Sequence, residues 1–190
     1  MTIAVSYTLG FVRCKENNKV LLLNREKAPW MGKWNGIGGK IEPNETSMES
    51  MRREAIEETG LDLPNFKSRG ILTWEIHVTK DKPRVFKDTN ENKTHMPITE
   101  GLYLFTADIT IEQYENYNTP IIYNDEGILD WKDIAWITHE YNYGIVDNVR
   151  FIFKYLFQAN ENDLFTVKYN DTELVNAEYL QGKNPLSCEK

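Results

Sequence analysis

The sequence predicts an α/β fold, and three observations predict it. Residues 3–13 and 19–24 are rich in aliphatic and β-branched side chains, and a polar turn at 15–18 separates them, which is typical of paired strands. Residues 46–59 carry the start and stop signals of a helix. Residues 145–158 space their apolar side chains as a second helix does. Both strands and helices are therefore expected along 190 residues, a length typical of one domain.

The first two strands are followed by a structured loop at 25–38, which is rich in glycine and tryptophan and has a short buried strand around 34–37. Beyond the first helix, residues 68–79 and 101–109 have strand composition and are expected to pair with each other. The polar residues 80–99 between them predict an exposed and mobile excursion.

The C-terminal half predicts a smaller set of elements. Residues 110–120 form a second insertion, and residues 181–190 are expected to be a flexible tail. The elements expected between them are a short apolar segment at 134–137, the helix at 145–158, and a closing hairpin with strands near 163–169 and 172–180 that turns at 170–171. Because the sequence shows no internal repeat or linker, residues 1–180 are expected to form a single domain.

The charge of the chain limits its partners. A net charge of −7 gives no general attraction to duplex nucleic acid or to an anionic membrane. No apolar run approaches membrane-spanning length, so neither kind of partner is expected. An acidic protein can still bind a polyphosphate when metal ions bridge the two. The oligomeric state does not follow from the sequence.

The two cysteines bear on the compartment. Cys14 and Cys188 lie near opposite ends of the chain and have no metal-binding spacing. Two isolated thiols indicate a reducing compartment, although one disulfide is also compatible with this count. The N-terminal residues lack a basic segment followed by a long apolar run. A cytoplasmic protein is therefore expected.

An acid-rich stretch of 23 residues carries the strongest functional signal. Its fixed positions are Gly39, Glu45, Arg53, Glu54, Glu57, Glu58 and Gly60. With a typical usage of about 7% for each residue, chance produces this set on the order of 10⁻⁸ times per starting position. Thr46 or Ser47 can cap a helix here, and Gly60 is a natural stop.

The spacing of the glutamates gives the stretch its chemistry. At about 100° per residue, Glu54, Glu57 and Glu58 fall within an arc of about 100° on one helix. Like charges this close destabilise a helix unless a cation compensates them, and carboxylate oxygens prefer hard ions such as Mg²⁺ or Mn²⁺. The alternative is a solvated acidic face with an internal pair between Arg53 and a glutamate.

The stretch from Gly39 to Leu61 resembles the Nudix box, the signature of the Nudix hydrolases. Ala55 departs mildly from the pattern, which usually has a larger aliphatic residue there. The resemblance implies an α/β/α sandwich around a mixed β-sheet, with the box forming a loop–helix–loop catalytic motif. It also implies Mg²⁺-dependent hydrolysis of a nucleoside diphosphate linked to another group.

The resemblance also implies roles for individual residues. Glu54 and Glu58 would be the principal metal ligands, Glu57 would assist, and the backbone carbonyl of Gly38 would join them. Arg53 would orient a glutamate, either Glu45 or Glu57, by a charge-assisted contact.

Outside the box, the chain is similar to the oxidised-purine nucleoside triphosphatases of the MutT type. The similarity rests on residues 7–9 and 33–40, and on Asp125 and Glu126 shortly before Trp131. Glu126 lies in a loop that can close over the helix, and we expect it to be a further metal ligand or the general base. Its alternative is an ordinary loop acid. Lys40 either contacts phosphate or is a surface lysine.

Four residues are candidates for binding a base. Asn35 can donate and accept hydrogen bonds together, which suits a purine edge, and Asp147 can accept from ring N–H groups. Thr8 and Trp74 match pocket positions of the similar enzymes, and Trp74 offers a ring for stacking. The structural alternatives are a turn residue for Asn35, a helix cap for Asp147 and a core side chain for Trp74.

The expected function is Mg²⁺-dependent hydrolysis of a nucleoside triphosphate to a monophosphate and pyrophosphate, with 8-oxo-dGTP as the first substrate to try. A second hypothesis keeps the chemistry but changes the substrate to ADP-ribose, a dinucleotide polyphosphate, capped RNA or a pterin triphosphate. A third is a non-catalytic nucleotide sensor built on the same fold. Retention of every glutamate in the box favours an enzyme.

Overall fold

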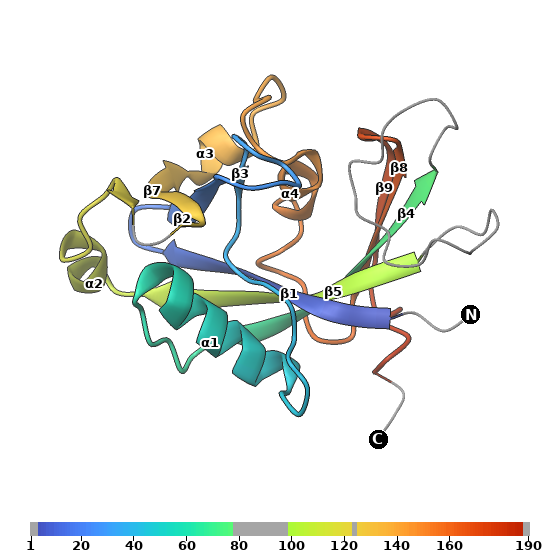
Figure 1. The fold of residues 1–190 in the computed structure, drawn as a ribbon, viewed down its shortest axis with the longest axis horizontal. Coiled ribbons are helices and arrows are strands. Elements are labelled where there is room, and N and C mark those ends of the chain that lie inside the picture. The colour runs from blue at the N-terminus through green and yellow to red at the C-terminus, as the bar shows by residue number, and fades with distance from the viewer. Residues whose placement is uncertain (1–3, 78–98, 123–124, 188–190) are drawn as a thin grey trace.

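The computed structural model describes residues 4–77, 99–122 and 125–187. A mixed β-sheet forms its centre, and helices cover both faces of the sheet (Figure 1). Within the described residues the main path of the sheet is β6-β7-β2-β1-β5-β4-β8-β9, and β3 pairs with β2. The strands are β1 (Ala4–Cys14), β2 (Lys19–Arg25), β3 (Trp34–Asn35), β4 (Lys67–His77), β5 (Thr99–Ile109), β6 (Ile121–Ile122), β7 (Gly127–Asp133), β8 (Leu164–Asn170) and β9 (Glu173–Leu180). The expected α/β sandwich around a mixed sheet is confirmed.

Strand alternation divides the core between the two faces. Leu9 and Phe11 of β1 pack with the residues around α3 (Ile134–Ile137) and α4 (Asp147–Ile152). Val12 and Cys14 of the same strand point to the other face and pack under α1 (Ser47–Thr59). The sheet therefore holds α1 and α4 in fixed positions on its opposite faces.

Helix α1 begins and ends where the sequence predicts. Thr46 is the N-cap, and it forms a capping box with Glu49, since each side chain accepts a hydrogen bond from the other residue's backbone N–H. Gly60 ends the helix with φ 75°, a left-handed conformation that favours glycine. Met51 and Ala55 are buried against the sheet. These anchors leave the face with the glutamates available for a site.

The second helix is shorter than expected, and the prediction over 145–158 was wrong in its length. Helix α4 covers only Asp147–Ile152, and the chain continues to Ala159 as turns with mixed i+3 and i+4 hydrogen bonds. The aromatic side chains of this segment pack on separate partners: Phe153 on Phe11, and Tyr155 on Tyr179. We attribute the irregular path to these separate aromatic contacts.

The middle of the chain differs in detail from the prediction. Strands β4 and β5 pair antiparallel as expected. The excursion expected at 80–99 lies outside the described residues, except for Thr99, which starts β5. The insertion at 110–120 contains a short helix, α2 (Ile111–Glu115), which the sequence analysis missed together with strands β6 and β7.

The C-terminal hairpin is confirmed, and its turn has Asp171 at φ 54°. The described part of the expected flexible tail, residues 181–187, is instead anchored. The backbone N–H of Gly182 donates to the Asp163 carboxylate at 2.8 Å, and the Asn184 side chain donates to the Glu161 carbonyl at 2.6 Å. No helix in the described ranges has the length and apolar character needed to cross a membrane.

Candidate active site

A cavity of about 510 Å³ opens beside the glutamate face of α1. Four segments meet there: the end of β2, the loop after β3, α1 and the loop before β7. The residues that line it are Arg25, Lys27, Gly38, Gly39, Glu54, Glu57, Glu58, Asp125 and Glu126. The structure thus brings together the residues expected to hold a metal ion, including Glu126, which lies 68 positions beyond Glu58 in the chain.

Glu58 is the most buried carboxylate of the cavity, with 5% of its surface exposed. One of its oxygens accepts a hydrogen bond from the backbone N–H of Gly38 at 2.9 Å. Burial is the main cause that raises the pKa of Glu58 to about 8, and the nearby carboxylates of Glu54 and Glu126 raise it further. A buried carboxylate among like charges is a group that a bound cation would stabilise.

The glycines of the box are explained by close packing. A Cβ atom on Gly39 would overlap the Glu54 carboxylate, so the backbone at this position lies directly against the acid. Gly38 has φ 137°, and a Cβ there would overlap the Thr8 carbonyl. Burial raises the pKa of Glu54 as well, although Arg53 opposes this shift. The loop and the helix are therefore fitted together around two carboxylates.

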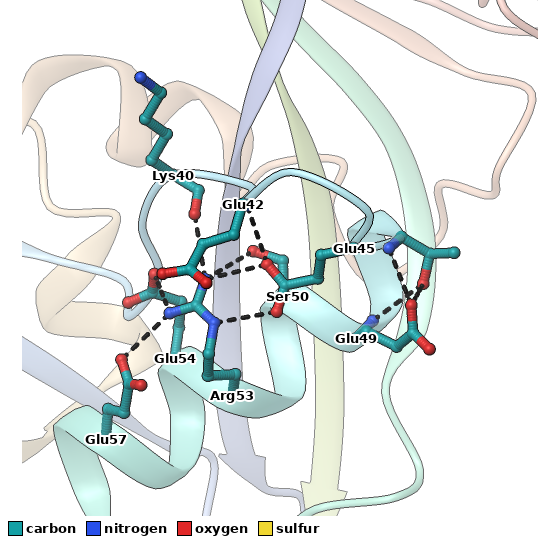
Figure 2. Close-up of polar contacts among 9 residues, drawn as sticks. Lys40, Glu42, Glu45, Glu49, Ser50, Arg53, Glu54 and Glu57 are labelled. Atoms are coloured by element: carbon teal, nitrogen blue, oxygen red, sulfur yellow. Dashed lines mark hydrogen bonds and ion pairs between the residues drawn. The ribbon is translucent and has the colours of Figure 1, made fainter.

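Arg53 lies behind the cavity and links three glutamates (Figure 2). Its Nε and Nη2 atoms bind the two oxygens of Glu45 at 2.9 and 3.0 Å. Its Nη1 donates to Glu54 at 2.8 Å and to Glu57 at 3.1 Å. Nη2 also donates to the Lys40 carbonyl at 3.0 Å. The guanidinium thus fixes the start of the loop and the helix glutamates with a single planar group.

Glu45 is the strongest partner of Arg53. The hydrogen bonds from Arg53 are the main cause that lowers the pKa of Glu45 to about 2. The same contact raises the pKa of Arg53 above its ordinary value. Since Glu45 stays charged, it holds Arg53 in place and leaves the Nη1 group of Arg53 to bind Glu54 and Glu57.

The donor set of the cavity fits a hard divalent cation. The carboxylate oxygens of Glu54, Glu57, Glu58 and Glu126 are joined by the Gly38 carbonyl, which accepts no hydrogen bond from the described backbone. Among the described residues no three acidic, histidine or cysteine side chains yet converge on one point at coordination distance. Coordination would therefore require the more exposed side chains, such as Glu57, to turn inward.

Two basic residues of the cavity were missed by the sequence analysis. Arg25 and Lys27 lie at and just after the end of β2, where no motif marks them. Lys27 Nζ is 2.8 Å from Glu126 Oε1. The backbone N–H of Glu26 donates to the Glu126 carbonyl at 2.9 Å, so the two loops are paired. The place of Arg25 and Lys27 in the cavity therefore follows from the fold and not from a sequence motif.

Asn35 and Asp147 lie on neighbouring segments. Trp34 N–H donates to the Gly144 carbonyl, and Val146 N–H donates to the Trp34 carbonyl, which brings the start of α4 beside β3. The side-chain oxygen of Asn35 accepts from Gly36 N–H at 2.9 Å, and Asp147 pairs with Lys33 at 3.4 Å. Asn35 therefore also serves as a turn residue, which is the alternative role that the sequence analysis gave for it.

Thr8 and Trp74 do not share one face of the sheet. Thr8 points to the face of α1, and its buried hydroxyl finds no hydrogen-bond partner within the described residues. Trp74 lies on the opposite face, where its ring centroid is 6.3 Å from that of Tyr7. Lys40 is exposed, and Figure 2 shows its side chain pointing away from Arg53. The structure thus places Asn35 and Asp147 on neighbouring segments, and it separates Thr8 from Trp74.

Comparison with known proteins agrees with this geometry. The NUDIX domain family matches residues 7–148. The nucleoside triphosphatase NudI of an Enterobacter species is 31% identical over 129 residues, which are 66% of this chain and 77% of that protein. The oxidized purine nucleoside triphosphate hydrolase of Danio rerio is 36% identical over 70 residues, which are 37% of this chain and 45% of that enzyme.

A solved structure shows the same fold. The crystal structure of a MutT protein from Bacillus halodurans superposes with a TM-score of 0.64 at 24% identity. The match covers 91% of this chain and 95% of that one.

Proposed function

The chain belongs to the Nudix hydrolase family, and from that membership we propose that it hydrolyses nucleoside triphosphates to a nucleoside monophosphate and pyrophosphate, with Mg²⁺ or Mn²⁺ as cofactor. The NudI relative supports this substrate class by its name. The observation that carries the proposal is the cavity in which buried Glu58 and largely buried Glu54 lie with Glu57 and Glu126.

The chemistry of this proposal needs a held cation, an aligned water and a base. A divalent cation bound here would neutralise phosphate charge and lower the pKa of its water. Glu54 and Glu58 would hold the cation and Glu57 and the Gly38 carbonyl would assist, while Arg53 keeps Glu54 and Glu57 in position. Glu126 is a further ligand or the base that accepts the proton of the attacking water. The oxygen of that water would form a bond to the attacked phosphorus as the bridging P–O bond between the monophosphate and pyrophosphate groups breaks, which releases both products.

The first base to test is 8-oxoguanine. Among the relatives, the Danio rerio enzyme is named for oxidized purine nucleoside triphosphates, and its similarity to this chain covers less than half of either protein. Asn35 and Asp147 lie on neighbouring segments, and we propose that they bind one base edge, with Asn35 donating and accepting and Asp147 accepting. Removal of damaged nucleotides from the cytoplasmic pool would be the biological role.

A panel of nucleotides tests the proposal. With Mg²⁺ present, the wild type should convert a nucleoside triphosphate to monophosphate and pyrophosphate, which chromatography of the products distinguishes from stepwise loss of phosphate. Glu54→Gln and Glu58→Gln should each lose at least about 100-fold of this rate, since even residues that orient metal ligands are worth 10- to 100-fold. Glu115→Gln on α2 is the acidic control. Unchanged turnover in both cavity variants would contradict the metal site.

The choice of substrate is tested separately. If 8-oxo-dGTP is cleaved no better than dGTP, or if Asn35→Ala leaves selectivity intact, the base-binding role is wrong. Preferential cleavage of ADP-ribose, a dinucleotide polyphosphate or capped RNA in the same panel would keep the chemistry and replace the substrate. Binding of nucleotides without turnover would favour the sensor.

A further inference from the structure

Lys27 occupies an unusual place, because it is a cation on the rim of an acidic cavity. It lies just beyond the end of β2, and its ammonium pairs with Glu126 Oε1 at 2.8 Å. Its side chain is 55% exposed, so the head group can leave this contact without disturbing the core. The backbone pairing of Glu26 with Glu126 keeps the two loops adjacent whichever partner the ammonium has.

The carboxylate of Glu126 has two competing uses. In the structure it binds the Lys27 ammonium, and in the proposed function it would join the metal ligands. An ammonium 2.8 Å from one of its oxygens repels a second cation at the same carboxylate. We propose that Lys27 is a phosphate-binding residue that exchanges partners, leaving Glu126 for the polyphosphate of the substrate when metal and nucleotide bind. This inference rests on the proposed function.

Lys27 is better placed for this exchange than the other cations near the cavity. Arg25 is held by a hydrogen bond from its Nε to the Pro29 carbonyl at 2.8 Å. Lys40 is exposed and projects away from the Arg53 cluster (Figure 2). A lysine has a compact charge on a flexible four-carbon stem, which suits a contact that changes partner.

The exchange predicts two opposite effects of a single substitution. In Lys27→Gln, Glu126 loses its competing cation, so Mn²⁺ should bind about two- to fivefold more tightly, the range expected for an exposed ion pair. The same variant lacks its phosphate contact, so the KM for the nucleoside triphosphate should rise about tenfold with little change in kcat. Loss of a merely structural ion pair would not tighten metal binding.

Isothermal titration calorimetry with Mn²⁺ alone measures the first effect, and steady-state pyrophosphate release from dGTP measures the second. Lys168→Gln is a matched control, because Lys168 pairs with Glu75 at 3.2 Å with similar exposure of 46% and 34%, but outside the cavity. Lys27→Arg keeps the charge and should restore the KM.

The proposal stands only if both effects appear in Lys27→Gln and neither appears in Lys168→Gln. Unchanged or weaker Mn²⁺ binding overturns the competition at Glu126, and an unchanged KM overturns the phosphate contact. If Lys27→Gln behaves as wild type while Glu58→Gln is inactive, this inference fails and the proposed function stands. If the wild type shows no turnover, the proposed function fails, and with it the phosphate role of Lys27.

Discussion

Replacement of Arg53 by methionine is the most informative single perturbation of the site. Methionine keeps much of the apolar stem but removes the guanidinium N–H groups that donate to Glu45, Glu54 and Glu57. The side chains of Glu45 and Glu54 are only 13% and 14% exposed, so both carboxylates lose their cation in a poorly hydrated place. The variant should therefore lose both stability and activity.

The magnitude follows from burial. Breaking a buried ion pair by removing one partner costs about 3–5 kcal/mol. Because Arg53 is 25% exposed, we expect the loss of unfolding free energy to fall at or below the lower end of that range, about 2–3 kcal/mol. Displacement of residues that orient metal ligands lowers kcat/KM by about 10- to 100-fold. Urea unfolding followed by circular dichroism, with a chelator present, measures the first quantity, and pyrophosphate release with Mg²⁺ measures the second.

The neighbouring arginine supplies the control. Arg52 pairs with Asp62 at 2.8 Å on the surface, where the two side chains are 43% and 64% exposed. Arg52→Met should therefore change the unfolding free energy by less than about 1 kcal/mol and leave turnover intact. If Arg53→Met and Arg52→Met behave alike in both assays, the orienting role of Arg53 is refuted.

Three further predictions follow from the same contacts. Because Arg53 holds the pKa of Glu45 near 2, below its ordinary 4.5, the charged Glu45 stabilises the fold fully above pH 4.5, and this stabilisation is lost as the pH falls toward 2. The melting temperatures of Glu45→Gln and wild type should therefore differ at pH 6 and converge at acidic pH, and a constant difference would contradict this. Glu58→Gln removes a buried carboxylate from among like charges, so calorimetry in the presence of a chelator should show an inactive protein that is about 1–3 kcal/mol more stable than wild type. A melting temperature below that of wild type would count against a destabilising buried charge at Glu58. Gly39→Ala forces a Cβ into the Glu54 carboxylate and should lower turnover more than about tenfold. The control Gly182→Ala, at a position with open space and φ 65°, should cost only about 1 kcal/mol of backbone strain, and equal turnover in the two variants would contradict the steric role of Gly39.

The sequence predicts the helix of the site well because its signals are local. Thr46, Glu49 and Gly60 mark the ends of α1 by hydrogen bonds and backbone geometry within a few residues. The glutamate spacing then sets which carboxylates share a face. The family resemblance adds Glu126, and the structure places it in the same cavity.

Contacts that depend on tertiary packing were harder to predict. The segment 145–158 has a helical apolar pattern, but its aromatic rings pack on different strands, and the regular helix ends at Ile152. Lys27 carries no motif and gains its place only because β2 ends beside the loop of Glu126. Thr8 and Trp74 were grouped from similarity, whereas strand alternation directs them to opposite faces.

Binding of Mn²⁺ to the wild type and to Glu58→Gln, followed by electron paramagnetic resonance, tests the central claim most directly. The account predicts saturable binding to the wild type at the α1 cavity and at least about tenfold weaker binding to the variant, because Glu58 is the buried ligand. Equal binding to the two proteins would contradict a cation site made from the glutamates of α1.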